Sequence, residues 1–205
     1  MFYDLIYLLL LLSGIVILIE NRLNRVIMII GLQGLLLTVP VFQVHSLTEF
    51  HSWILVAMLL IFKVILTPSI LLWTANRNKM MEHTAPRFGY LATLFFFVIG
   101  LIGFLNISRG LGELPAGIDR IGITYIFLLL YLGVLTFIVR KHWIALIVGF
   151  MMFENGIFLL TLILHHGLPV GIEFGAFVDA ILVIVAAVAL RFRADVIQKS
   201  KEATA

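Results

Sequence analysis

Residues 143–164 read WIALIVGFMMFENGIFLLTLIL, an apolar run with a single carboxylate, Glu154, near its middle. The run is apolar on every side and long enough to cross a bilayer as a helix, which takes about 20 residues. A charge in hydrocarbon costs roughly 2.5–3.5 kcal/mol even on a lenient scale, so such residues usually face protein or water and mark an ion or proton path. This stretch therefore predicts a membrane helix that carries a functional group.

The composition of the whole chain agrees with this reading. Of its 205 residues, 62% are hydrophobic and 12% are charged, whereas a soluble domain is about half apolar and one quarter charged. The chain has no cysteine, which excludes disulfides, thiolate-bound clusters and cysteine nucleophiles within it. The net charge of +3 is typical of cytoplasmic loops of a membrane protein, so we expect lipid contact and no nucleic-acid partner.

Seven apolar runs predict an all-α integral membrane protein with about seven transmembrane helices. None of the runs alternates between polar and apolar residues, which argues against barrel strands. The first run begins at residue 2 without a basic segment before it, so we expect a spanning helix and not a removed signal peptide. The predicted spans are about 2–19, 26–44, 53–73, 88–107, 121–139, 143–164 and 170–190.

Basic residues divide unevenly between the two sets of loops. The richer set holds Arg22, Arg25, Arg77, Lys79, Arg87, Arg140, Lys141, Arg191, Arg193, Lys199 and Lys201. The opposite set holds only Arg109 and Arg120. Because basic loops stay in the cytoplasm, the N-terminus is predicted outside and the C-terminus inside. We expect a bacterial or archaeal cytoplasmic membrane.

A weak internal repeat relates the second span to the sixth and the third to the seventh. Gln33 in IIGLQGLLLTV corresponds to Glu154, and Lys63 in LLIFKVILTPSIL corresponds to Asp179 in GAFVDAILVIVAAV. The repeat predicts a parallel duplication of three-helix units, with an extra helix that keeps the units parallel. The expected parts are a first unit at 1–80, the extra helix and an outer loop at 81–119, a second unit at 120–193, and a polar cytoplasmic tail at 194–205.

Three ionisable residues are expected at one depth in the membrane. At about 1.5 Å per residue, Lys63, Glu154 and Asp179 lie roughly 18–21 Å from the basic boundary, and Gln33 roughly 12 Å. An opposite charge nearby offsets desolvation, so groups balanced in this way can exchange protons near neutral pH. The alternative is a buried ion pair between helices, in which Lys63 neutralises Asp179 or a carboxylate of another subunit.

Supporting polar residues have simpler interpretations. Gln33 cannot titrate and is expected to hold helices together, and Asn155 can donate a hydrogen bond to the neighbouring Glu154. Glu173 is either a proton-uptake group or a solvated carboxylate at a helix start. Pro68 predicts a kink in its helix. The turn Arg140-Lys141-His142 is interpreted as a lipid-headgroup contact or a topology signal.

The chain lacks the sequence patterns of soluble catalytic sites. It has no phosphate-binding glycine loop, no HExxH and no nucleophile elbow. We therefore expect no catalytic residue, no metal ligand and no cofactor-binding residue in this chain.

Residues 121–193 resemble the three-helix K subunits of complex I and its relatives. The similar features are the basic turn at 140–142, GFMMFENGIFLLTL with Glu154, and EFGAFVDAILVIVAAVALRFR with Asp179. The K family carries a glutamate at both places, and the second is aspartate here. With its extra N-terminal helices, the whole chain looks like component E of hydrogenase-4, a K-like subunit of membrane-bound group 4 nickel–iron hydrogenases, including formate hydrogenlyase-type complexes.

The resemblance implies a non-catalytic subunit between antiporter-like membrane subunits and the membrane anchor of a hydrogenase. The nickel–iron centre and iron–sulfur clusters would lie in partner subunits. Glu154 and Asp179 would belong to a lateral chain of protonatable groups, which Lys63 would extend. The alternatives are a structural scaffold subunit of a cation/proton antiporter-type or other complex I-like assembly, and a stand-alone secondary transporter.

Overall fold

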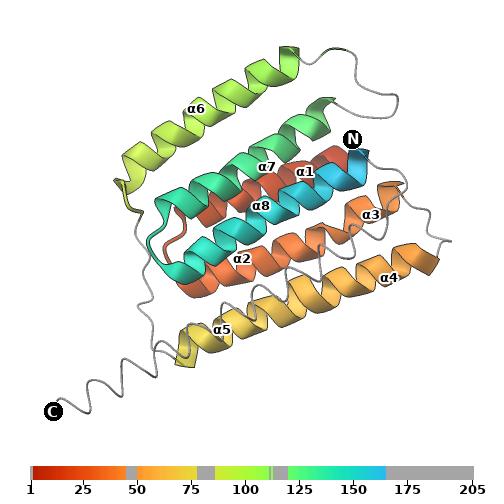
Figure 1. The fold of residues 1–205 in the computed structure, drawn as a ribbon, viewed down its shortest axis with the longest axis horizontal. Helices are drawn as coiled ribbons and strands as arrows, with labels where there is room; N and C mark the ends of the chain where they lie inside the picture. The colour runs from red at the N-terminus through yellow and green to blue at the C-terminus, as the bar shows by residue number, and fades with distance from the viewer. Residues whose placement is uncertain (1, 45–49, 78–85, 111, 113–119, 165–205) are drawn as a thin grey trace.

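The computed structural model describes residues 2–44, 50–77, 86–110, 112 and 120–164, and over these ranges the chain is a bundle of long helices without a β-strand (Figure 1). The elements are α1 (Phe2–Ile19), α2 (Leu23–Leu36), α3 (Thr38–Val44), α4 (Phe50–Leu59), the π-helical η1 (Leu60–Leu66), α5 (Thr67–Arg77), α6 (Gly89–Gly110), α7 (Arg120–Val139) and α8 (Trp143–Leu164). The all-α prediction is confirmed for the described residues.

Within the described part of the chain, five helical segments are long and apolar enough to cross a membrane. They are Leu23–Phe42, Ser52–Asn76, Gly89–Gly110, Arg120–Val139 and Trp143–Ile163, and Tyr3–Ile19 is a shorter apolar helix. The first six predicted runs are therefore helical. The seventh run, 170–190, and the tail at 194–205 lie outside the described residues, so the count of seven and the orientation stay predictions.

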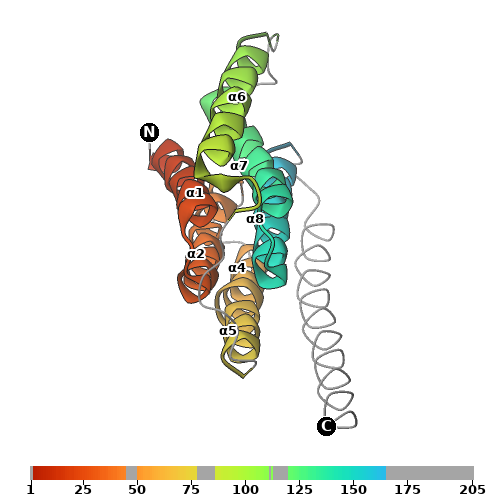
Figure 2. The same cartoon turned by 90° about the vertical axis from the view of Figure 1, so that its left-hand side faces the viewer.

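Four helices form the centre of the bundle. α7 packs on α8 and on α1, and α2 packs on α1 and on α8. The segment α4–η1–α5 lies along α2 at one edge, and α6 lies along α7 at the opposite edge (Figures 1 and 2). Successive segments alternate in direction, so α1 runs parallel to α7, and α2 parallel to α8 (Figure 1). This arrangement suits a parallel duplication, which stays a prediction because the last helix of its second unit lies outside the described residues.

Glycines bring α7 and α8 into backbone contact. A Cβ atom at Gly149 would lie 2.7 Å from the backbone nitrogen of Phe137. A Cβ atom at Gly133 would meet the backbone of Phe153, and one at Gly156 would lie 2.7 Å from the side chain of Leu130. In a membrane, where lipid is as apolar as the helices, such close packing by small residues is a main source of helix association.

Arg140, directly after α7, is buried and not available to a lipid headgroup. Its Nη2 atom lies 3.0 Å from the carbonyl oxygen of Ile17 and 2.7 Å from those of Leu18 and Glu20. The last carbonyls of a helix have no partner within it, and a cation there is favourable. The lipid-headgroup interpretation is therefore wrong for Arg140, which caps the end of α1, whereas Lys141 is exposed.

The basic residues of the described loops gather at one end of the bundle. The backbone N–H of Arg87 donates to the carbonyl of Val139 over 2.7 Å, which joins the start of α6 to the end of α7. In the neighbouring α1–α2 turn, the N–H of Arg22 donates to the carboxylate of Glu20 and, together with Arg25, holds the pKa of Glu20 below its usual value. One end of the bundle is thus strongly cationic.

The packing of α7 against α8 yields a stability prediction. Gly149→Ala should destabilise the protein by about 1–3 kcal/mol, because the new methyl group meets the backbone of Phe137 and an overpacked interface must shift. The matched control is Gly103→Ala in α6, where a Cβ atom would have no neighbour within 4 Å. The check is the unfolding midpoint of both variants in mild detergent. Equal midpoints for the two variants would contradict the close contact.

Candidate functional site

Four of the six site residues predicted from the sequence come together where α2, η1 and α8 meet. Gln33 comes from α2, Lys63 from η1, and Glu154 and Asn155 from α8. Gln33 is fully buried, and Lys63 and Asn155 are only 4% and 1% exposed. The other two residues, Asp179 and Glu173, lie outside the described residues.

Hydrogen bonds connect three of these side chains in series. Lys63 Nζ donates to Asn155 Oδ1 over 2.9 Å, and Asn155 Nδ2 donates to Gln33 Oε1 over 3.1 Å. Gln33 Nε2 then donates to the carbonyl oxygen of Leu10 in α1 over 3.3 Å. The same carbonyl accepts a hydrogen bond from Ser13 Oγ. The polar series therefore crosses the bundle from η1 to α1.

The direction of this series is fixed at both ends. A lysine ammonium only donates, so Asn155 must turn its oxygen to Lys63 and its nitrogen to Gln33. A backbone carbonyl only accepts, so Gln33 must turn its nitrogen to Leu10 and its oxygen to Asn155. Both amide orientations follow from this chemistry, and the ammonium is held in one place. Gln33 joins helices, as expected.

Glu154 faces the same ammonium but is held less tightly. Its Oε1 atom lies 3.7 Å from Lys63 Nζ, and its side chain is 19% exposed. Its Oε2 atom is buried without a hydrogen-bond partner among the described residues. The expectation that Asn155 donates to Glu154 is wrong, because Asn155 is engaged by Lys63 and Gln33. Adjacent helix residues do not face each other, and Lys63 lies between them.

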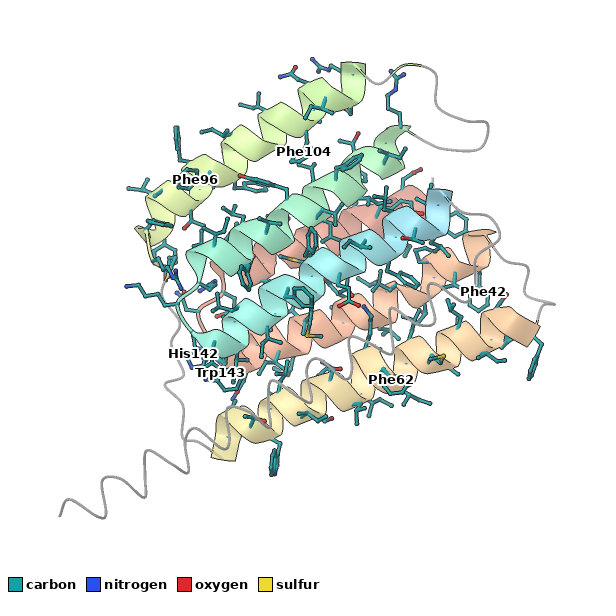
Figure 3. The ribbon with its side chains drawn as sticks, in the orientation of Figure 1. Phe42, Phe62, Phe96, Phe104, His142 and Trp143 are labelled. Atoms are coloured by element: carbon teal, nitrogen blue, oxygen red, sulfur yellow. The ribbon has the colours of Figure 1, made fainter. Side chains whose placement is uncertain are left out.

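A π-helical turn places Lys63. The N–H of Thr67 donates to the carbonyl of Phe62, five residues earlier, and the next residue is Pro68. Proline has no N–H to continue the ordinary α-helical ladder, so the turn before it can be wound more widely. The segment before Pro68 is thus a π-helix with Lys63 in its centre, and the kink predicted at Pro68 stays a prediction. Phe62, beside Lys63 in the sequence, is labelled on this segment in Figure 3.

Two glycines of α2 let this turn approach, and the sequence reasoning missed them. A Cβ atom at Gly34 would lie 2.9 Å from Lys63 Cβ and 3.1 Å from its carbonyl carbon. A Cβ atom at Gly31 would lie 3.0 Å from Pro68 Cγ. The available signal was the pair of glycines on either side of Gln33, since small residues in a membrane helix permit close backbone approach.

Counting residues from the basic boundary predicted the depth of Lys63 and Glu154 relative to each other, but not the depth of Gln33. Lys63 and Glu154 were expected at similar depth, and they contact each other. Gln33 was counted as nearer the boundary, yet it bonds directly to Asn155. The count for Gln33 started from Arg25, which lies within the first turn of α2 and not at its end. A basic residue can be part of the membrane helix itself, because its long side chain still reaches the membrane interface.

The arrangement can hold a proton-exchanging carboxylate beside a fixed cation. Glu154 either stays ionised and forms an ion pair with Lys63, or takes up a proton and leaves the ammonium bonded to Asn155. No group of three or more histidine, cysteine, aspartate or glutamate residues that could hold a metal occurs within the described part of the chain. The side chains present offer proton exchange at the Glu154 carboxylate and electrostatic control by Lys63, 3.7 Å away.

The hydrogen-bonded series makes Asn155 the residue on which the site depends. Asn155→Leu should destabilise the protein by roughly 1–3 kcal/mol for each buried polar group left without its partner, here Lys63 and Gln33. Asn106→Leu, at an exposed position of α6, is the matched control and should have little effect. Thermal unfolding in detergent compares the two variants. A small and equal effect of both would show that the series contributes nothing to stability.

Comparisons of the chain with protein-family models, with curated proteins and with solved structures gave no significant match.

Proposed function

We propose that this chain is a non-catalytic membrane-arm subunit of a complex I-like, membrane-bound hydrogenase, in which it supplies intramembrane groups for proton translocation coupled to electron transfer. Two independent lines support the proposal. One is the resemblance of residues 121–193 to K subunits, which rests on the sequence around Glu154 and Asp179. The other is the buried contact of Glu154 with Lys63, a residue outside the K-like segment.

The observation that carries the proposal is that Lys63 is held firmly in place, whereas Glu154 is held less tightly. Lys63 is buried and bonded to Asn155, whereas Glu154 keeps one buried carboxylate oxygen without a hydrogen-bond partner among the described residues. A purely structural ion pair is usually satisfied at both partners, because an unsatisfied buried charge is costly. A carboxylate with one open position beside a fixed ammonium suits a group that receives a proton and passes it on.

In this proposal, the residues have distinct roles. Glu154 exchanges the proton, and Lys63 controls the charge of Glu154 at a distance of 3.7 Å. Asn155 and Gln33 position Lys63 through the series that ends at Leu10. Asp179 is proposed as the next protonatable group along the membrane on the basis of the resemblance, and Glu173 as a proton-uptake group near the surface.

The association with a hydrogenase is tested by isolation of the tagged full-length chain in mild detergent, followed by mass spectrometry of what comes with it. We expect a nickel–iron large subunit together with antiporter-like membrane subunits. A cation/proton antiporter assembly without a hydrogenase subunit would overturn the hydrogenase part of the proposal. Recovery of the chain alone would overturn its role as a subunit and favour a stand-alone transporter.

The role of Glu154 is tested by Glu154→Gln, which removes the charge but keeps the shape and the ability to accept a bond from Lys63. We expect proton uptake by inverted membrane vesicles to fall at least tenfold, while the complex still assembles, because glutamine cannot exchange a proton. Glu20→Gln makes the same chemical change at the cationic end of the bundle and should leave proton uptake intact. Co-purification of the partner subunits measures assembly in both variants.

The same experiment separates a proton path from a scaffold. A scaffold predicts that Glu154→Gln either prevents assembly or leaves proton uptake unchanged. Asp179→Asn is the corresponding variant for the second carboxylate, with loss of proton uptake in an assembled complex as the expected result. Normal proton uptake in both variants would contradict the proposed path.

A further inference from the structure

An apolar groove runs along the surface between α7 and α8, away from the Lys63 site. It has a volume of about 150 Å³. Its lining contains only glycine, valine and phenylalanine, namely Gly133, Val134, Phe137, Gly149, Phe150 and Phe153. Gly133 and Gly149 are the places where the two helices touch, so they form the floor. Val134, Phe137 and Phe150 are 41%, 50% and 41% exposed, so the groove opens outwards.

The groove extends from the α7–α8 turn to a depth equal to the thickness of one membrane leaflet. Phe137 lies two residues before the end of α7, and Phe153 lies ten residues after the start of α8. At about 1.5 Å per residue, the groove therefore begins about 3 Å from the α7–α8 turn and extends to about 15 Å. The hydrocarbon core of a bilayer is about 30 Å thick, so this is the depth of one leaflet. The turn itself, with His142 and Trp143, lies at the cationic end of the bundle (Figure 3).

Two exposed cations lie close to the end of α7, near which the groove begins. Lys141 is exposed in the α7–α8 turn. Arg87 is also exposed, and its backbone N–H bonds to the carbonyl of Val139, which holds it beside the end of α7. Arg140 differs from both, because its guanidinium is buried against the carbonyls of α1. An apolar channel thus leads to a polar rim that carries positive charge.

We propose that this groove binds an anionic phospholipid, with one acyl chain between α7 and α8 and the phosphate held by Lys141 and Arg87. Basic sites between transmembrane helices on the cytoplasmic side suit anionic headgroups in this way. The acyl chain packs on the phenylalanine side chains, and the glycine floor gives it room. This inference concerns lipid binding alone and does not depend on the proposed hydrogenase function.

Charge complementarity favours an anionic lipid over other occupants of the groove. The apolar run at 170–190 of this chain is followed by Arg191 and Arg193, so a helix from this segment would add cations at the same end. A second copy of the chain, seated symmetrically, would bring the same Arg87 and Lys141 against their counterparts. An anionic headgroup, in contrast, has the charge that complements Arg87 and Lys141.

Native mass spectrometry of the full-length chain, purified in mild detergent, tests the proposal with phosphatidylglycerol and phosphatidylcholine of identical acyl chains. The wild-type chain should retain phosphatidylglycerol at lower concentration than phosphatidylcholine. The double variant Arg87→Gln, Lys141→Gln should lose this preference by about fivefold for each cation removed. Arg109→Gln, at the opposite end of the bundle, is the control and should leave the preference unchanged.

A second variant tests the acyl-chain site. Val134→Phe fills the groove from its exposed wall and should weaken the retention of both lipids, whereas Leu91→Phe on the exposed face of α6 should not. Equal retention of the two lipids by the wild-type chain would overturn the proposal. Unchanged retention in Val134→Phe would overturn the groove as the binding site, even if the two cations still attract phosphatidylglycerol.

Discussion

A buried ammonium group sets the constraints for the centre of this bundle. Lys63 lies among apolar helices, and its charge is tolerated only where hydrogen-bond acceptors and a counter-charge surround it. Asn155 and Glu154 provide these from α8, Gln33 orients Asn155 from α2, and the carbonyl of Leu10 orients Gln33 from α1. One charge thereby ties together four segments that are far apart in the sequence.

The backbone adapts to this charge. The π-helical winding of η1 presents Lys63, and Gly31 and Gly34 of α2 leave space for the approach of η1 and α5. On the other side of the bundle, Gly133 and Gly149 bring α7 and α8 together. Apolar side chains gain little by leaving lipid for a protein interior, so small residues and polar bonds determine how membrane helices pack. Both devices are present here: glycines and polar bonds act together where η1 and α5 approach α2, and glycines bring α7 and α8 together.

The charged residues differ in the groups that accept their hydrogen bonds or balance their charge. Arg140 is buried because the last carbonyls of α1 accept its hydrogen bonds, while Lys141, one residue later, is exposed. Lys63 has a carboxylate and an amide, and Arg25 forms an ion pair with Glu20. Neighbours in the sequence can therefore have unrelated surroundings, one buried against helix carbonyls and the other exposed.

The sequence by itself determined the class of protein, the approximate ends of six helices and some of the interior polar residues, namely Gln33, Lys63, Glu154 and Asn155, because hydrophobic length and the cost of a buried charge are local properties of the chain. It also predicted that Lys63 and Glu154 lie at a similar depth, but it gave Asp179 or a carboxylate of another subunit as the partner of Lys63, and the contact with Glu154 comes from the structure. Only the tertiary structure decided that Lys63 bonds to Asn155 across 92 positions of sequence, that Asn155 turns away from Glu154 towards Gln33, and that Arg140 caps α1. These contacts depend on which faces of distant helices meet. Close backbone packing at a few glycines determines which faces meet. Hydrophobic periodicity does not indicate these faces, because the helices are apolar on every side.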